Sequence, residues 1–263
     1  MPVGALVGYD GSPGANAAID AGASLFPAAH GWITYVWVPP FASAKVRSRL
    51  RPLAHDVTEL ISMVEYEGER EAQRLVATGV TLARAAGWDA EPLLKQTWGG
   101  HGLRIAQAAE EVHADVVLVG SRGLGGTQAV LGSVSDIVVH YAARPVVVVP
   151  HPMLAAEYAA LPNGPVAVGW DGSPGAEMAF AAAVHLFPER TVLLITVDEG
   201  TDVSPLPVDL REKARQDVIG LSVEHGCGFH ARATCDALVA TATDHNAAVV
   251  VVGSRGRSAA REI

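Results

Sequence analysis

Short apolar runs alternate with longer segments of mixed character along the first 150 residues. Runs rich in small, β-branched or aromatic residues predict buried strands, and apolar residues at helical spacing predict amphipathic helices between them. Strands are expected at 3–9, 32–38, 90–96, 115–119 and 145–149. Helices are expected at 15–26, 59–86, 103–112 and 133–142, and the pattern assigns no element to residues 41–58.

Alternation of strands and helices predicts an α/β fold with a parallel sheet and helices on both faces. In such sheets a ligand binds beyond the carboxyl ends of the strands, where the strand order reverses. Asp10 follows the first predicted strand and Gly120 follows the fourth. We therefore expect these two residues to lie close together at the same edge.

The sequence contains an internal repeat of this pattern. Val7–Ala15 reads VGYDGSPGA and Val168–Ala176 reads VGWDGSPGA, and Gly-Ser-Arg-Gly recurs at Gly120–Gly123 and Gly253–Gly256. A repeat of this length predicts two related domains, which we place at residues 1–150 and 164–263. The second copy predicts strands at 166–170, 192–197, 229–234 and 247–252, and helices at 176–187, 211–224 and 236–244, after a linker at 151–163.

The second copy is shorter than the first. It has 28 fewer residues between its Asp and its Gly-Ser-Arg-Gly, and only seven residues follow Gly256. Counterparts of the last helix and of the fifth strand are therefore expected to be missing. Natural truncation, a frameshift and a fragment are equally compatible with this ending.

Composition narrows the classes of partner. The formal net charge of −9 disfavours binding to nucleic acid. The short basic stretch Lys45–Arg51 is expected to form a solvent-exposed surface. The two cysteines, Cys227 and Cys235, form no metal-binding pattern. No apolar run reaches membrane-spanning length and no signal peptide is recognised, so we expect a cytoplasmic protein with no membrane partner.

Three motifs together carry a family resemblance: Asp10-Gly11-Ser12, Gly120-x2-Gly123 and Gly132-Ser133. The chain resembles a tandem universal stress protein, with eight residues rather than the family's usual nine before Gly132. The resemblance implies Rossmann-like domains with a five-stranded parallel sheet of order 3-2-1-4-5, the second sheet lacking its last strand. It implies an ATP site. Apart from the resemblance, the carboxylate of Asp10 could hold Mg²⁺ with the phosphates. The implied site residues are Asp10, Gly120, Gly123, Gly132, Ser133, Val134 and Ser135.

These residue types suit a nucleotide. Glycines let backbone N–H groups approach phosphate oxygens, and a helix beginning at Ser133 would direct its positive end at them. The hydroxyls of Ser133 and Ser135 add donors. Asp10 could accept hydrogen bonds from ribose or adenine, and the backbone near Val36–Val38 would meet the adenine edge. As alternatives, Asp-Gly-Ser-Pro is also a helix cap and the Gly-rich loop is also a plausible simple connector.

The resemblance implies a stress-linked regulatory protein that forms a homodimer through its fifth strand and acts on an unidentified regulatory protein. A slow ATPase is the less favoured alternative, because the sequence offers no Walker lysine, no clear pair of metal-binding acids and no obvious general base. A nucleotide-free interaction module is the third reading. The second copy keeps Asp171 but lacks the second Gly-Ser, so we expect weak or absent ATP binding there.

Overall fold

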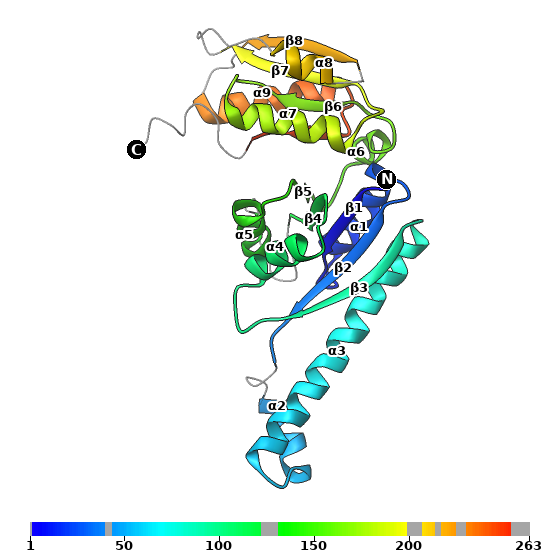
Figure 1. The fold of residues 1–263 in the computed structure, drawn as a ribbon, viewed down its shortest axis with the longest axis vertical. Coiled ribbons are helices and arrows are strands. Elements are labelled where there is room, and N and C mark those ends of the chain that lie inside the picture. The colour runs from blue at the N-terminus through cyan, green and yellow to red at the C-terminus, as the bar shows by residue number, and fades with distance from the viewer. Residues whose placement is uncertain are drawn as a thin grey trace. The chain divides into compact units, whose positions relative to one another are not determined.

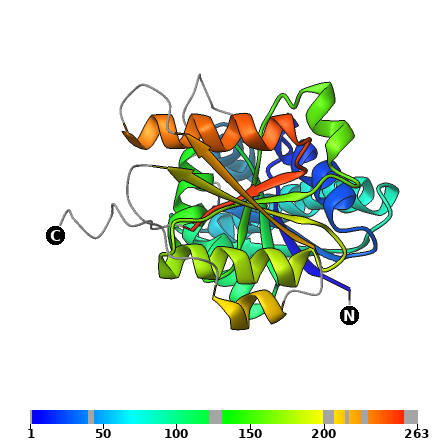
Figure 2. The ribbon, with the colours of Figure 1, turned by 90° about the horizontal axis from the view of Figure 1, so that it is seen from above.

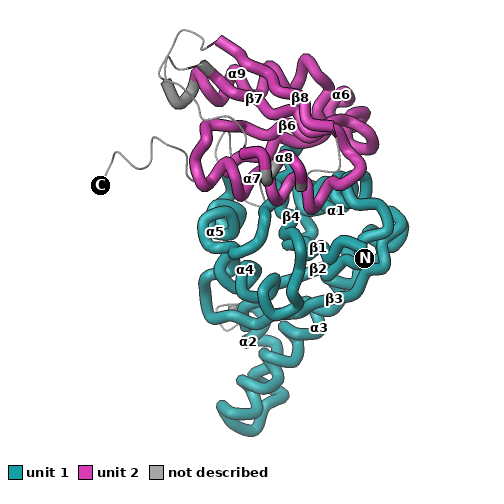
Figure 3. Tube along the Cα trace, turned by 45° about the horizontal axis from the view of Figure 1, so that its top comes forward, with its two compact units in different colours: residues 1–153 teal, residues 154–263 magenta. Residues whose placement is uncertain are grey.

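The computed structural model describes residues 2–39, 44–121, 131–198, 207–213, 217–224 and 230–253. The chain divides into two compact units, residues 1–153 and 154–263 (Figure 3). Each unit is a layered α/β structure, and each is described by itself.

The first unit is built on a five-stranded sheet in which every neighbouring pair is parallel (Figure 1). Its order is β3-β2-β1-β4-β5, which confirms the order that the sequence resemblance implies. The strands are β1 (Gly4–Gly8), β2 (His30–Trp37), β3 (Asp89–Gln96), β4 (Val116–Gly120) and β5 (Val146–Val149). The helices are α1 (Pro13–Leu25), α2 (Ala44–Leu50), η1 (Arg51–Leu53), α3 (Val57–Ala85), α4 (His101–Glu111) and α5 (Ser133–Tyr141).

Strands β1 and β4 form the buried centre of this sheet, and all five residues of β4 are buried. Continuous apolar runs are typical of parallel strands that helices cover on both faces. Helices α1 and α3 pack together on one face, while α4 and α5 pack together on the other. Loops that lead from the carboxyl ends of the strands into these helices therefore gather at one edge.

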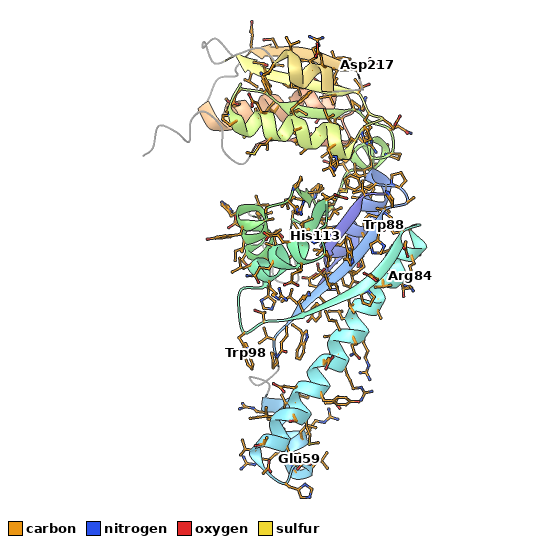
Figure 4. The ribbon with its side chains drawn as sticks, in the orientation of Figure 1. Glu59, Arg84, Trp88, Trp98, His113 and Asp217 are labelled. Carbon is orange, nitrogen blue, oxygen red and sulfur yellow. The ribbon has the colours of Figure 1, made fainter. Side chains whose placement is uncertain are left out.

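Trp88 anchors α1 to the sheet from the turn before β3 (Figure 4). Its side chain is buried, and its indole N–H donates to the carbonyl of Phe26 over 2.9 Å. Gly22 and Gly31 leave room for the ring, since a Cβ atom on either would lie within 3 Å of it. Tryptophan buries a large apolar area but needs a partner for its N–H, and Phe26 supplies that partner.

Helix α3 is much longer than the sheet beside it. Its N-terminal half, with α2, extends past the strands in Figure 1, and Glu59 marks that end in Figure 4. Asp56 caps the helix by accepting from the N–H of Glu59 over 2.8 Å. The segment 41–58, to which the sequence assigned nothing, therefore holds α2 and η1, apart from residues 41–43, which lie outside the described ranges.

An ion-pair cluster ties α4 to β3. Glu111 accepts from Arg104 over 2.6 Å and from Lys95, on β3, over 2.7 Å. The hydrogen bond from Arg104, followed by that from Lys95, lowers the pKa of Glu111 from 4.5 to about 2. Because the folded state binds this proton less tightly, the cluster stabilises the fold above about pH 4.5, and this contribution is lost as the pH falls towards 2.

We expect Glu111→Gln to lower the free energy of unfolding at pH 7 by roughly 0.5–1 kcal/mol, a modest effect because solvent screens a half-exposed group. Urea unfolding at pH 7 and pH 3 measures it, and the difference between variant and wild type should shrink at pH 3. Glu110→Gln is the control, because Glu110 makes no ion pair with any described residue. Equal losses for both variants would contradict the assignment.

The second unit repeats this design with a four-stranded parallel sheet of order β8-β7-β6-β9. This confirms that the second sheet, as described, lacks a fifth strand. Figure 2 shows α7 and α9 on opposite sides of its twisted strands. The strands are β6 (Val166–Gly169), β7 (Val192–Asp198), β8 (Val218–Glu224) and β9 (Val249–Val251). The helices are α6 (Ala155–Ala160), α7 (Pro174–Leu186), α8 (Val208–Lys213) and α9 (His230–Asp244).

Two sequence-based assignments in the second unit are wrong. The helix expected at 211–224 is a short helix, α8, followed by strand β8, and the strand expected at 229–234 is the start of α9 from residue 230 onward. Val218, Ile219 and Val223 are β-branched, and β8 pairs along its whole length with β7. In addition, the expected linker 151–163 contains α6.

Candidate functional site

A cavity of about 440 Å³ lies at the carboxyl edge of the first sheet. Cavities of about 300–1,000 Å³ commonly hold small molecules and cofactors. Six of the seven residues expected from the sequence line it, and the seventh, Gly123, lies outside the described residues. The six are Asp10, Gly120, Gly132, Ser133, Val134 and Ser135.

The turn after β1 places Asp10 in the wall of the cavity. The N–H of Ser12 donates to Oδ1 of Asp10 over 2.9 Å, and Gly11 takes a φ of +78° that permits the tight turn. The hydroxyl of Ser12 then accepts from the N–H of Ala15 over 3.1 Å and caps α1. The capping interpretation of this motif is therefore correct. None of the described residues donates to the second carboxylate oxygen of Asp10, which leaves it available to a ligand.

Gly120 brings the end of β4 directly against the start of α1. A Cβ atom at this position would lie 2.6 Å from the backbone carbon and oxygen of Gly14. The carbonyl of Gly120 also accepts from the hydroxyl of Ser135 over 2.7 Å, and Gly132 N–H donates to the carbonyl of Ser121 over 2.8 Å. These contacts fix the start of α5 beside the end of β4.

The hydroxyl of Ser135 was expected to donate to the ligand, but in the structure it donates within the protein. A hydroxyl has one hydrogen to donate, and Ser135 already donates it to Gly120. What Ser135 can offer a ligand is its backbone N–H. Ser133 is exposed, so its hydroxyl is free to reorient towards a ligand.

The first turn of α5 provides backbone donors that have no partner among the described residues. The helix begins at Ser133, and the N–H of Asp136 is the first to bond within the helix, to Gly132. No described side chain caps this end. The preceding N–H groups, and the positive end of the helix dipole, are therefore directed at the cavity edge, an arrangement that favours an anion.

A second helix begins at the same edge. His101 and Ile105 of α4 line the cavity, and Gly102 allows α4 to pack tightly on α5. A Cβ atom on Gly102 would lie 2.7 Å from the carbonyl oxygen of Val134. The residues that begin α4 and α5 thus share one wall of the cavity.

The cavity contains few charged groups. Among its described lining residues Asp10 is the one carboxylate, and neither lysine nor arginine is present. Burial, then the charges of Asp10 and Glu71, raises the pKa of Tyr35, and burial followed by Asp10 raises that of Tyr9. Both tyrosines are therefore neutral at physiological pH. No group of three potential metal ligands occurs among the described residues. The described lining therefore presents one carboxylate among mostly apolar and hydroxyl-bearing side chains.

Sequence reasoning missed several lining residues, namely Thr34, Tyr35, His101 and Ile105. Each occupies a position that the switch-point rule could have indicated, at the carboxyl end of β2 or at the start of the helix after β3. Val36 also lines the cavity, which agrees with the expectation for the second strand.

The second unit reproduces half of this geometry. Ser173 N–H donates to Asp171 Oδ1 over 2.9 Å, and Ser173 caps α7 as Ser12 caps α1. A Cβ atom on Gly253 would lie 2.5 Å from the backbone of Gly175, just as at Gly120. The described part of the unit ends at Gly253 and contains no counterpart of α5.

Comparison with known proteins gives a consistent set of matches. Residues 5–150 match the model of the "Universal stress protein family". A protein of that name from Mycolicibacterium smegmatis is 40% identical over 95 residues, which are 36% of this chain and 31% of that protein. Universal stress protein Rv2005c of Mycobacterium tuberculosis is 32% identical over 209 residues, 72% of this chain and 68% of that protein.

A solved structure shares the fold of this chain. A universal stress protein from Archaeoglobus fulgidus aligns with 94% of this chain and 85% of its own, with a TM-score of 0.60 and 20% identity. Another from the same organism, aligned over 56% of this chain and 96% of its own with 20% identity and a TM-score of 0.39, was solved in complex with dAMP.

Within the described residues, no helix has the length and apolar character needed to cross a membrane.

Proposed function

Because this chain belongs to the universal stress protein family, we propose that its first unit binds ATP and that binding regulates a protein partner in the stress response. One observation carries the proposal. The cavity gathers Asp10, the end of β4 and the uncapped start of α5, residues that lie far apart in the sequence.

The residues that line the cavity suit the different parts of a nucleotide. Backbone N–H groups at the start of α5 and the hydroxyl of Ser133 would hold the phosphates. The apolar side chains of Val36 and Ile105 would hold the base, and Asp10 would accept from ribose or adenine. If Mg²⁺ accompanies the phosphates, Asp10 is the carboxylate available to it in this wall.

The first unit is proposed to be the principal ATP site. The second unit has the turn at Asp171 but, as described, no helix corresponding to α5. Roughly one ATP per chain is therefore expected.

Calorimetry tests this assignment with a matched pair of variants. In each turn the aspartate accepts a hydrogen bond from the N–H of the serine two residues later, Ser12 for Asp10 and Ser173 for Asp171. Asp10→Ala and Asp171→Ala therefore remove the equivalent hydrogen bond from the two turns. Asp10→Ala should weaken ATP binding about tenfold, the effect of losing a hydrogen bond to a charged group, and Asp171→Ala should leave the affinity unchanged. A stoichiometry near two, or equal losses in both variants, would count against a single site in the first unit.

The regulatory role would require a surface that partners can recognise. Strand β5 pairs with β4 and, among the described residues, has no partner on its other edge. We assign this edge to a two-fold homodimer in the cytoplasm, since an open strand edge is a template for pairing. Light scattering at tens of micromolar protein tests it, and a monomeric mass would contradict it.

A further inference from the structure

The hydroxyl of Thr34 is buried in the wall of the cavity without a hydrogen-bond partner. Thr34 is 1% exposed, and its Oγ1 atom has no partner among the described residues. Ile33, the preceding residue of β2, faces α3, where a Cβ atom on Gly79 would lie 2.8 Å from it. Because side chains alternate along a strand, Thr34 faces the opposite layer, which contains Val36 and Ile105.

The residues opposite Thr34 on the neighbouring strands have no polar side chain. Thr34 lies opposite Gly8 on β1 and Leu93 on β3. Gly8 has no side chain and Leu93 is apolar, so neither can accept or donate through its side chain. A buried hydroxyl left without a partner is destabilising, whereas an apolar side chain of similar size is not.

The second unit shows that the fold accepts an apolar residue at this position. Ile195 lies opposite Gly169 just as Thr34 lies opposite Gly8, and it is fully buried. Its backbone plays the same part, because Trp170 N–H donates to the Ile195 carbonyl over 2.8 Å and Tyr9 N–H donates to that of Thr34 over 2.9 Å. The hydroxyl of Thr34 is therefore dispensable for the strand and the sheet.

We propose that Thr34 is a specificity residue whose hydroxyl binds the polar edge of a nucleobase. The inference rests on the proposed ATP site and adds a contact on the base. The uncapped donors that favour an anion lie at the start of α5, whereas Thr34 lines the cavity on the side of the sheet that faces the layer with the apolar side chains of Val36 and Ile105. Those surroundings fit a flat heterocycle with one polar edge, and they would leave most phosphate oxygens unpaired.

Replacement of Thr34 by valine tests the proposal, because valine keeps the shape of the side chain and removes its hydroxyl. Calorimetry with ATP should show an affinity about tenfold weaker than that of the wild type, as expected for one lost hydrogen bond in a buried site. Binding of inorganic tripolyphosphate, which has no base, should be unchanged. The melting temperature of the ligand-free variant should equal or exceed that of the wild type.

Thr241→Val is the control, because Thr241 is a buried threonine whose hydroxyl donates to Ala237 over 2.8 Å in the second unit. It should leave ATP affinity unchanged. If the wild type binds ATP and Thr34→Val binds it equally well, the inference fails while the ATP site stands. Equal losses for ATP and tripolyphosphate, or a lower melting temperature for Thr34→Val, would also overturn it. If the wild type does not bind ATP, the proposed function itself fails.

Discussion

Replacing Ser133 by glutamate is expected to weaken ATP binding about 30-fold while leaving the fold intact. Ser133 is the first residue of α5 and lies at the cavity edge. An added carboxylate there would face the phosphates in the region where the N–H donors gather, and like charges brought together in a binding site cost several kcal/mol. A loss of about 2 kcal/mol corresponds to roughly 30-fold in the dissociation constant.

The same substitution is favourable for the helix. A negative side chain in the first turn interacts well with the helix dipole, so the free energy of unfolding should stay the same or rise slightly. The ATP affinity measured by calorimetry should therefore fall, while the stability measured by thermal unfolding without ligand should not. Ser62→Glu on α3 adds the same charge at an exposed position and should leave affinity unchanged. If Ser133→Glu binds ATP like the wild type, the phosphates do not lie at the start of α5.

Replacing Gly120 by alanine is expected to destabilise the first unit by about 2 kcal/mol or more. The new methyl group would lie 2.6 Å from the backbone of Gly14, and backbone cannot move aside as a flexible side chain can. Overpacking of this kind typically costs about 1–3 kcal/mol. For a unit of this size the midpoint of thermal unfolding should fall by roughly 5 °C.

Two matched variants complete the experiment. Gly253→Ala should destabilise the second unit in the same way, since its Cβ atom would lie 2.5 Å from the backbone of Gly175. Gly220→Ala should have little effect, because nothing lies within 4 Å of the added atom and the residue is in an extended strand. Calorimetric unfolding of the three variants measures these changes. A neutral Gly120→Ala would show that α1 and β4 separate easily, contrary to the packing described.

Sequence patterns predicted the first sheet well because its central strands are continuous apolar runs that end at a glycine. The second unit was harder from Arg211 onward. Its residues 218–224 read VIGLSVE, and their β-branched side chains favour a strand, whereas the expected helix followed the first copy, which has a long helix at the corresponding place. Pairing with β7 along the whole segment makes it a strand.

The sequence predicted those residues of the candidate site whose motifs mark the end of a strand or the start of a helix. Asp10 and Gly120 follow strands, and Ser133 begins a helix, so the rule for parallel sheets brought them together. The same rule also places Thr34 at this edge, but it gives no sign of a role for the hydroxyl, because a threonine within a strand is ordinary in sequence. That role is indicated by the burial of the hydroxyl without a partner among the described residues. The commitment of the Ser135 hydroxyl to Gly120 also depends on contact across 15 residues.

The contact between Gly14 and Gly120 bears on the thermodynamics of ligand capture. Backbone meets backbone there, with no side chain between them whose rotamers must be ordered. The bonds from Ser135 to Gly120 and from Gly132 to Ser121 hold the next segment to the same point. These described residues are already held in place, so they add little ordering cost when a ligand binds. The part of the binding enthalpy that arises at them should then come from new contacts with the ligand.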